Sequence, residues 1–419
     1  MAKGIMYVDN IRVEFDDEPT IMDVCRKAGV EMPNFCFHSD LSVYGACRMC
    51  MVEDLDTGKI DAACTTKPKN GMRIRTNTSR LLKYRRMILE LMLASHCRDC
   101  TACEKNRSCR LQEMAVRFGI HHVHFKDTRE HVPMDFSSPA VTFDLNKCIL
   151  CGDCVRVCEE MQGMGILNFA YRGSSAQVMP AFDRKMAQTK CVSCGQCAAV
   201  CPTGAITVKN QIGEAWRAIH DPSKRVVIQI APAVRVAIGE SYGLPAGENV
   251  LDKLVTALKI MGADEVYDTI FGADLTVREE SAEFLRRLET GENLPLMTSC
   301  CPAWVKFVEN EYPEFKENIS TCRSPQGMFS AVIKDYFAEK DKEDGKRTMV
   351  VSIMPCTAKK GEILRPDNFT DGRQDTDYVI TTTEVVRMIK QMGLQFTELE
   401  NESADAPFSV PSGACLLYT

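Results

Sequence analysis

The stretch that decides the fold runs from residue 148 to residue 202 and contains CILCGDCVRVC (148–158) and CVSCGQCAAVCP (191–202). Each run has the spacing C-x2-C-x2-C-x3-C. In this pattern three thiolates hold one 4Fe-4S cubane and the fourth cysteine ligates the other cubane. Neither a zinc site nor a disulfide framework requires two runs with this repeated spacing. The sequence therefore predicts two cubanes, one held by Cys148, Cys151, Cys154 and Cys201, the other by Cys191, Cys194, Cys197 and Cys158.

The composition is that of a globular protein from a reducing compartment. A length of 419 residues fits about three domains. The net charge of -6 comes without the excess of basic residues that nucleic acid would require, so we expect no nucleic-acid partner. The chain opens without an apolar signal segment and contains no run of 18 apolar residues, so we expect a cytoplasmic protein without membrane contact. In that compartment the 22 cysteines indicate metal binding.

Residues 1–79 predict a 2Fe-2S domain. The apolar alternation over residues 7–15 predicts strands joined by a turn at Asp9-Asn10, and a helix should follow over residues 21–28, closed by Gly29. A glycine-bearing loop then leads into four cysteines, which are Cys36, Cys47, Cys50 and Cys64. These features resemble a plant-type ferredoxin, although the gap between the first two cysteines is longer than in that type. A zinc site remains an alternative, because the spacing does not exclude it.

Residues 80–119 predict a helix followed by a third cubane. The helix, over residues 79–95, is amphipathic, and its Lys83, Arg85 and Arg86 form either a solvated face or a docking patch for an acidic partner. After it comes H-x3-C-x2-C-x5-C, in which one imidazole and three thiolates can hold a cubane that is easier to reduce than a four-thiolate one. The spacing resembles a histidine-ligated module of hydrogenases and of respiratory complex I, which implies the ligands His96, Cys100, Cys103 and Cys109.

Other residues near this module have no such assignment. Cys97 has no place in the ligand scheme. His121, His122 and His124 lack carboxylates at useful spacing, so we expect them to be surface or packing residues.

In residues 215–419 the dense cysteine spacing gives way to a pattern of alternating strands and helices, which predicts an α/β domain. Strands are expected at residues 225–231, 265–268, 295–299 and 349–354, and the first and last have the continuous apolar character of buried parallel strands. Helices should separate them, one over residues 250–261 ended by Gly262 and another opened by Ser324-Pro325. In such a doubly wound sheet, functional sites gather at the carboxyl ends of the strands.

Two cysteine motifs stand at those strand ends: TSCCPAW at residues 298–304 and MPCTAKKGE at residues 354–362. They resemble the first two signature motifs of the iron-only (FeFe) hydrogenases. The upstream modules occur in the order found in the long bacterial members of that family. The resemblance covers essentially the whole chain and predicts α+β iron-sulfur modules at residues 1–79, 80–119 and 140–208, followed by an incomplete α/β hydrogenase domain at residues 215–419.

In that family a cubane is joined by a cysteine thiolate to a two-iron unit that carries CO, cyanide and a dithiolate. By motif position, the resemblance implies that Cys301 and Cys356 ligate the cubane and that Cys300 carries protons. It places Lys359 against a cyanide ligand. Glu280, Glu283 and Ser320 match positions of the proton relay, and the residues matching the lining of the two-iron unit are Ala231, Pro232, Gln326 and Met354.

One family feature is missing from the 419 residues. The third signature, a glutamate followed by C-P-G-G-C, supplies two further cubane ligands, and the chain ends at Thr419 before it. We therefore expect a C-terminally truncated catalytic domain whose active-site cluster is incomplete. Cys415 comes too early to replace these ligands and is expected to be a tail cysteine.

The resemblance implies reversible oxidation of dihydrogen after maturation by the dedicated assembly machinery. Electrons would pass through one 2Fe-2S and three 4Fe-4S clusters to or from ferredoxin or an NAD(P)H-oxidising flavoprotein subunit. The alternative is a non-catalytic electron-transfer subunit with a remnant hydrogenase domain. A fragment of complex I would account for residues 1–208 but not for TSCCPAW.

Overall fold

The computed structural model describes residues 4–127, 129 and 131–406, so Cys415 lies outside the described residues. The chain forms two compact units: residues 1–191 with 196–207 (unit 1), and residues 192–195 with 208–419 (unit 2). Among the described residues, no helix has both the length and the apolar character needed to cross a membrane.

Unit 1 begins with a mixed five-stranded sheet in the order β2-β1-β5-β3-β4. Asp9 and Asn10 both adopt positive φ, and the antiparallel hairpin that they join confirms the predicted turn. The predicted helix is also confirmed, and it packs its apolar residues on the sheet. The elements are β1 (Gly4–Val8), β2 (Ile11–Phe15), α1 (Ile21–Lys27), β3 (Met51–Asp54), β4 (Ile60–Ala62) and β5 (Arg73–Arg75).

The rest of unit 1 consists of short elements around cysteine-bearing loops. The amphipathic helix predicted over residues 79–95 is confirmed as α2 (Ser79–Ala94), capped by the Thr78 hydroxyl. The following elements are η1 (Cys100–Ala102), α3 (Arg110–Arg117), β6 (Val141–Phe143), η2 (Leu145–Lys147), α4 (Asp153–Arg156), η3 (Val157–Met161), β7 (Asn168–Ala170), η4 (Gly173–Ser175), β8 (Gln177–Met179), η5 (Ala181–Asp183), η6 (Met186–Gln188), α5 (Gln196–Val200) and β9 (Ile206–Val208). Strands β6 and β9 pair, as do β7 and β8.

One part of the expectation for α2 is wrong. Arg85 does not belong to a solvated face, because its side chain is only 3% exposed. Its guanidinium donates to the carbonyl oxygens of Met49 (3.0 Å) and Met51 (2.7 Å), the residues on either side of Cys50. The surface assignment of His121, His122 and His124 is confirmed, since all three are exposed.

Unit 2 is built on a four-stranded parallel sheet in the order β11-β10-β12-β15, which confirms the predicted doubly wound layout. Strand β10 (Lys224–Ile230) pairs with β11 (Glu265–Asp268) and β12 (Arg347–Met354), and β12 pairs with β15 (Tyr378–Thr381). Successive side chains of β10 alternate between two cores. Val226, Ile228 and Ile230 pack among helices on one face, whereas Val227 packs with Phe329 on the other.

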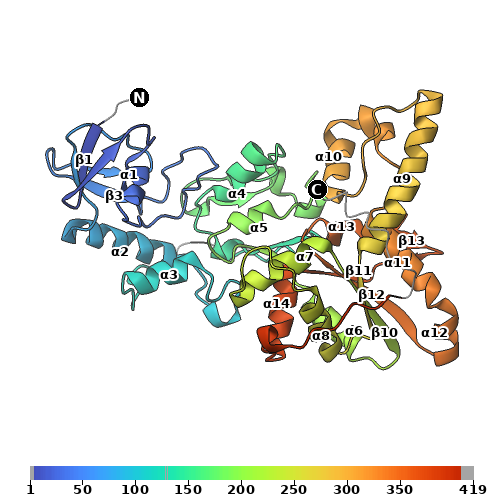
Figure 1. The fold of residues 1–419 in the computed structure, drawn as a ribbon. Coiled ribbons are helices and arrows are strands. Elements are labelled where there is room, and N and C mark those ends of the chain that lie inside the picture. Colours follow the sequence, from blue (N-terminus) through green and yellow to red (C-terminus); the bar gives the residue numbers. More distant parts are fainter. Residues whose placement is uncertain (1–3, 128, 130, 407–419) are drawn as a thin grey trace. The chain divides into compact units, whose positions relative to one another are not determined.

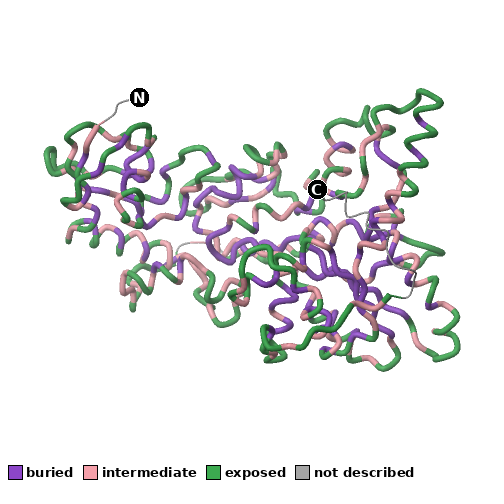
Figure 2. The backbone as a smooth tube through the Cα atoms, in the orientation of Figure 1, coloured by how far each residue is buried: buried purple, intermediate pink, exposed green. Residues whose placement is uncertain are grey.

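Helices therefore cover both faces of this sheet, as Figure 1 shows with α6, α8 and α14 on one side and α11 and α12 on the other. Figure 2 shows β10 and β12 buried along most of their length. Gly262 ends α8 in the left-handed conformation, and the Ser324 hydroxyl caps α11, so both predicted helix boundaries are confirmed. The helices are α6 (Ile212–Ile219), α7 (Pro232–Ala237), η7 (Ile238–Tyr242), α8 (Leu251–Met261), α9 (Ile270–Thr290), α10 (Pro302–Glu311), η8 (Pro313–Asn318), α11 (Pro325–Tyr336), α12 (Ala338–Asp344), α13 (Lys359–Glu362), η9 (Pro366–Asn368), α14 (Thr382–Gln391) and η10 (Phe396–Glu398).

The strand predicted at residues 295–299 is wrong. This segment makes only an isolated bridge between Met297 and Ile319, at the base of the loop that follows α9. A short hairpin, β13 (Phe369–Thr370) with β14 (Arg373–Gln374), was not predicted. The TSCCPAW motif therefore begins in a loop and ends in α10.

Candidate iron-sulfur centres and active site

The first cysteine set forms one buried group in unit 1. Cys36, Cys47, Cys50 and Cys64 are all buried, and their thiols interact in two pairs, Cys36 with Cys47 and Cys50 with Cys64. The hydrogen bond from the Cys36 thiol lowers the pKa of Cys47 to about 6, and the amide of Phe35 also donates to this sulfur (3.4 Å). Amide donors and thiolate character are what a 2Fe-2S cluster requires of its ligands.

The backbone of this loop is held by its surroundings. Gly45 has φ of +69°, and a Cβ there would lie 2.6 Å from Thr65 Cγ2, so only glycine fits. Arg85 fixes the carbonyls on either side of Cys50, as described above. Cys25, which the sequence did not single out, is buried nearby, and burial raises its pKa to about 12. It is therefore a protonated core thiol.

The histidine set lines a single small cavity. His96, Cys100, Cys103 and Cys109 all face it, together with Cys97. The ring of His96 is oriented by the amide of Arg98, which donates to Nδ1 (3.2 Å). Its Nε2 is buried and has no partner. Burial and the nearby Lys147 lower the pKa of His96, so the imidazole is neutral. A neutral imidazole whose Nε2 is buried, held in position and without a hydrogen-bond partner is suited to be a cluster ligand.

The first cubane set of the two-run region also shares a cavity, lined by Cys148, Cys151, Cys154 and Cys201. The structure thus brings Cys201 of the second run to the three cysteines of the first run. Burial raises the pKa of Cys154, and the neighbouring thiols of its own set raise it further, which a cluster's positive iron would offset.

The two runs repeat one backbone conformation. Leu150 and Gly152 in the first run and Ser193 and Gly195 in the second all have positive φ, between 57° and 81°. In the second set, Cys158 lies in η3 and Cys197 in α5, and these two elements pack together. Repeated left-handed turns curve each loop, as wrapping a cube requires.

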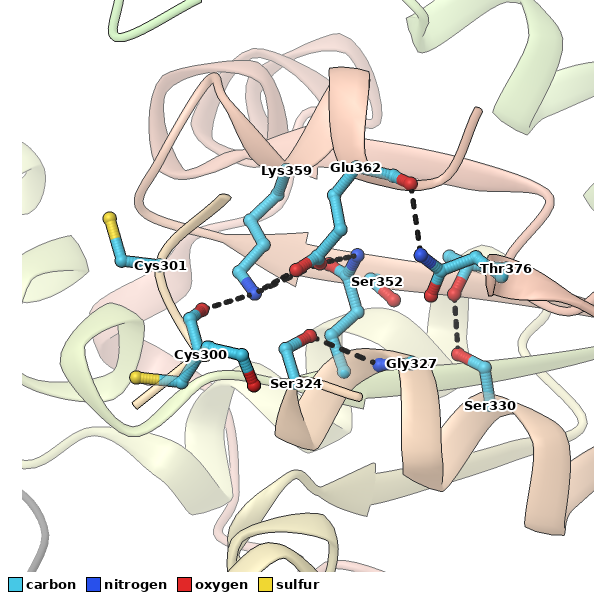
Figure 3. Close-up of polar contacts among 12 residues, drawn as sticks. Cys300, Cys301, Ser324, Gly327, Ser330, Ser352, Lys359, Glu362 and Thr376 are labelled. Atoms are coloured by element: carbon cyan, nitrogen blue, oxygen red, sulfur yellow. Dashed lines mark hydrogen bonds and ion pairs between the residues drawn. The ribbon is translucent and has the colours of Figure 1, made fainter. Parts of the chain in front are cut away.

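In unit 2, the two cysteine motifs meet through Lys359. Its Nζ donates to the carbonyl oxygen of Cys300 (2.9 Å) and to both carboxylate oxygens of Glu362 (3.0 and 2.9 Å), as Figure 3 shows. Gln326 Nε2 also donates to Glu362 (3.0 Å), which leaves Gln326 Oε1 buried without a partner. The ammonium group of Lys359, held by Glu362, and the unpaired amide oxygen of Gln326 are suited to bind a polar, anionic cofactor.

The neighbouring residue fixes the position of Lys359. The side chain of Lys360 is fully buried and its Nζ contacts the carbonyl of Val379 (2.6 Å) and the carboxylate of Glu384 (2.9 Å). Burial lowers the pKa of Lys360, while the charge of Glu384 raises it. This pair ties α13 to β15 and α14.

Of the remaining predicted residues, four lie at the carboxyl ends of β10 and β12, and the two adjacent cysteines lie directly before α10. Ala231 and Pro232 begin α7 directly after β10, and Met354 is the buried last residue of β12. Cys301 caps α10, where its Sγ accepts from the amide of Trp304 (3.5 Å), and Cys356 follows β12. Cys300 and Cys301 are both exposed.

Glu283 lies at the centre of a buried polar cluster. Ser320 Oγ donates to Glu283 Oε2 (2.8 Å), and Arg287 Nη2 donates to Oε1 (2.6 Å). Burial raises the pKa of Glu283, but the hydrogen bonds from Ser320, Arg287 and the amide of Thr321 outweigh it, so the pKa is lowered. Glu280 stands one turn earlier on α9, and its Oε1 is buried without a partner. A cavity of about 600 Å³ borders Glu283 and Ser320.

Sequence reasoning missed several of these residues. Arg287 and Gln229 belong to no motif, and Glu362 ends the second cysteine motif but was given no role. The spacing of Glu283 and Arg287 at i and i+4 is nevertheless a helix ion-pair signal. Gln229, on β10, is completely buried and donates to Ser330 Oγ (2.7 Å) and Ser352 Oγ (2.9 Å). Nothing in its local sequence marks it.

Cysteine-lined cavities in unit 1 and a lysine-anchored cysteine motif in unit 2 are the features expected of an iron-sulfur protein. Known domain families agree. Residues 5–79 match a 2Fe-2S iron-sulfur cluster binding domain, and residues 85–124 match the NADH-ubiquinone oxidoreductase-G iron-sulfur binding region. Residues 147–205 match a 4Fe-4S dicluster domain, and residues 224–419 match the C-terminal domain of the iron only hydrogenase large subunit.

The chain belongs to the iron-only hydrogenase family. It is 39% identical to the NADP-reducing hydrogenase subunit HndD of Solidesulfovibrio fructosivorans, over 100% of this chain and 73% of that protein. It is 33% identical to iron hydrogenase 1 of Clostridium pasteurianum, over 99% of this chain and 72% of that protein. Among solved structures, apo FeFe-hydrogenase HydA1 from Chlamydomonas reinhardtii is similar, with 40% identity over 49% of this chain and 53% of that chain, at a TM-score of 0.45.

Proposed function

We propose that this protein catalyses the reversible reduction of protons to dihydrogen, with electrons carried by its accessory iron-sulfur clusters. The observation that carries the proposal is the buried acid cluster of Glu283 and Ser320 beside the loop that bears the TSCCPAW motif. Ser299, the residue before Cys300, donates its hydroxyl proton to the carbonyl oxygen of Cys322, two residues after Ser320. A hydrogen bond thus connects the segment that carries the acid cluster to the TSCCPAW loop, which supports this proposal.

The family's cofactor supplies the redox-active iron at which protons and dihydrogen interconvert. In this chain, Cys301 and Cys356 would hold its cubane portion. Lys359 would present its ammonium group to an anionic ligand, held in place by Glu362. Four further residues would line the two-iron portion: Ala231, Pro232, Gln326 and Met354.

Cys300, Glu280, Glu283 and Ser320 would move protons through the protein. Ser320 and Glu283 are already hydrogen-bonded (2.8 Å), and thiols, carboxyls and hydroxyls exchange protons when they come within hydrogen-bond reach. Cys300→Ser should keep the active-site iron but lose most turnover, because a serine hydroxyl is a far weaker acid than a thiol. Loss of the iron in this variant would instead make Cys300 a cluster ligand.

The accessory clusters would be held by the four ligand sets named above, in domains at residues 1–79, 80–119 and 140–208 ahead of the catalytic domain at residues 215–419. His96→Cys tests the histidine set. A fourth thiolate adds negative charge, so the reduction potential of that cluster should fall. The check is a redox titration followed by electron paramagnetic resonance, and an unchanged midpoint would contradict the assignment.

For the electron partner, we propose a nicotinamide-linked flavoprotein subunit, with ferredoxin as the competing partner. The similarity to a subunit named NADP-reducing supports this choice, as does the match to the NADH-ubiquinone oxidoreductase-G region. We also propose a cytoplasmic location and a requirement for the hydrogenase maturation machinery. Co-purification of a flavin-containing subunit that supports hydrogen-dependent NAD(P)+ reduction would support the first partner, and activity with ferredoxin alone would favour the second.

Anaerobic expression with the maturation machinery tests the activity. When the protein is extended with the family's third signature, it should evolve hydrogen from a reduced viologen dye and show infrared bands of CO and cyanide. Residues 1–419 alone offer only Cys301 and Cys356 as cubane ligands and should show neither. The Cys356→Ser variant is the matched control, because it should lose the active-site bands and keep the accessory clusters. Iron and sulfide without these bands in the extended protein would instead indicate a non-catalytic electron-transfer subunit.

A further inference from the structure

Cys322 is a thiol inside the acid cluster that the proposed function does not use. Its Sγ lies 3.8 Å from Glu283 Oε2, the same oxygen that accepts from Ser320. Its carbonyl oxygen accepts from Ser299, and its amide donates to Ser320 Oγ (3.2 Å). The thiol is therefore fixed between the acid cluster and the residue that precedes Cys300.

The hydroxyl of Ser320 already has two hydrogen-bond partners in the cluster. Its single hydroxyl proton is directed at Glu283, and one of its lone pairs receives the amide of Cys322. Glu280, the other carboxyl, keeps a buried Oε1 with no hydrogen-bond partner. The Ser320 hydroxyl therefore points to Glu283 and not to Glu280, and a proton passes from Glu283 to Glu280 through Ser320 only when this hydroxyl turns.

Glu280 and Glu283 are three residues apart on α9, so both carboxyls project from the face of the helix that Cys322 contacts at Glu283. Burial raises the pKa of Cys322, and the charges of Glu283 and then Glu280 raise it further, so the thiol stays protonated. A protonated thiol can donate to one carboxylate while its sulfur accepts from the other carboxyl.

We propose that Cys322 is a relay residue that transfers protons between Glu283 and Glu280, in parallel with Ser320. The O–H bond of protonated Glu283 breaks as an S–H bond forms, while the original S–H proton passes to Glu280. The sulfur remains neutral, one proton has moved and no electrons are transferred. The reverse sequence serves hydrogen oxidation. This inference rests on the proposed function, because it assigns a path within the same relay.

A double-mutant cycle in the matured, extended protein tests the parallel path. Ser320→Ala and Cys322→Ala should each lower hydrogen evolution by less than about tenfold, and the double variant by about 10²-fold or more, because only then are both paths closed. Cys322→Ser keeps an exchangeable proton, so it should recover most of the turnover that Cys322→Ala loses. Iron content and the cofactor's infrared bands should match the parent in every variant.

Two outcomes of this cycle would overturn the proposal. If Cys322→Ala changes nothing in either background, the thiol carries no protons. If either single variant alone abolishes turnover, the two groups do not act in parallel.

A second measurement does not depend on turnover. The S–H stretching band of Cys322, identified by its loss in Cys322→Ala, should shift when Glu283→Gln removes the acceptor charge. The band of Cys25, a buried thiol of unit 1, is the matched control and should stay in place. An unshifted Cys322 band would refute the contact. An extended parent protein without hydrogen evolution but with the shift would instead refute only the proposed function.

Discussion

The two units are stabilised in different ways. In unit 2, apolar side chains fill both faces of a parallel sheet, from Val226 on one side to Phe329 on the other. In unit 1, candidate ligands are part of the core. Cys36, Cys47 and Cys151 belong to the cluster of buried residues that joins α2 and α3 to the cysteine loops. We therefore expect the cysteine loops of unit 1 to depend on bound clusters for their stability, whereas the sheet of unit 2 depends on hydrophobic packing.

Removal of iron gives the largest expected effect. A chelator under anaerobic, reducing conditions should abolish hydrogen-exchange protection in residues 36–64, 96–109 and 148–158, because their cores then lose the clusters. Residues 224–230 and 347–354 of the unit 2 sheet should stay protected. Exchange mass spectrometry checks this. Equal loss of protection in both units would show that the comparison is wrong.

Gln229→Leu tests whether the core of unit 2 depends on its polar network. The substitution leaves the hydroxyls of Ser352 and Thr269 without their buried partner. Each buried group left unsatisfied costs about 1–3 kcal/mol, so the free energy of unfolding of unit 2 should fall by about 3 kcal/mol. Urea unfolding followed by circular dichroism measures it.

Gln395→Leu is the matched control for this substitution, because Gln395 is exposed. Its unfolding midpoint should stay close to that of the parent. Equal midpoints for Gln229→Leu and Gln395→Leu would mean that the network does not stabilise the sheet.

Gly204→Ala tests the close packing around a cluster cavity in unit 1. A Cβ at this position would lie 2.6 Å from Cys103 Sγ, a candidate ligand, so the cavity must distort. Overpacking costs about 1–3 kcal/mol. We expect a changed electron paramagnetic resonance signal and lower iron content. Gly213→Ala, in α6 of unit 2, is the matched control, because a Cβ there has no heavy atom within 4 Å. This substitution should leave the stability of the protein unchanged or increase it. A signal identical to the parent's would contradict the contact.

The acid cluster of unit 2 gives the smallest expected effect, a dependence on pH. Because the folded protein lowers the pKa of Glu283 from its ordinary value of 4.5, its contribution to stability is present above that pH and is lost as the pH falls through the lowered pKa. Glu283→Gln should flatten this acid slope in urea midpoints measured against pH. Glu289→Gln, exposed on the same helix, should not. If the urea midpoints of the parent, Glu283→Gln and Glu289→Gln depended on pH in the same way, Glu283 would not contribute to the acid slope.

Sequence alone determined the features that depend on neighbouring residues. Cysteine spacing identified the candidate ligands, because ligand geometry is encoded within a few residues. The Asp9-Asn10 turn and the ends of α8 and α11 followed from turn and capping chemistry. The apolar runs at β10 and β12 revealed the buried strands of unit 2.

Only the tertiary structure decided the features that depend on distant partners. Arg85 is buried because carbonyls more than thirty positions away accept its protons. Residues 295–299 form no strand, since only an isolated bridge to Ile319 is available to them. Cys322 meets Glu283 across 39 positions, and Gln229 meets Ser352 across 123. No local pattern specifies such contacts, because folding brings those side chains together through the packing of whole helices and strands.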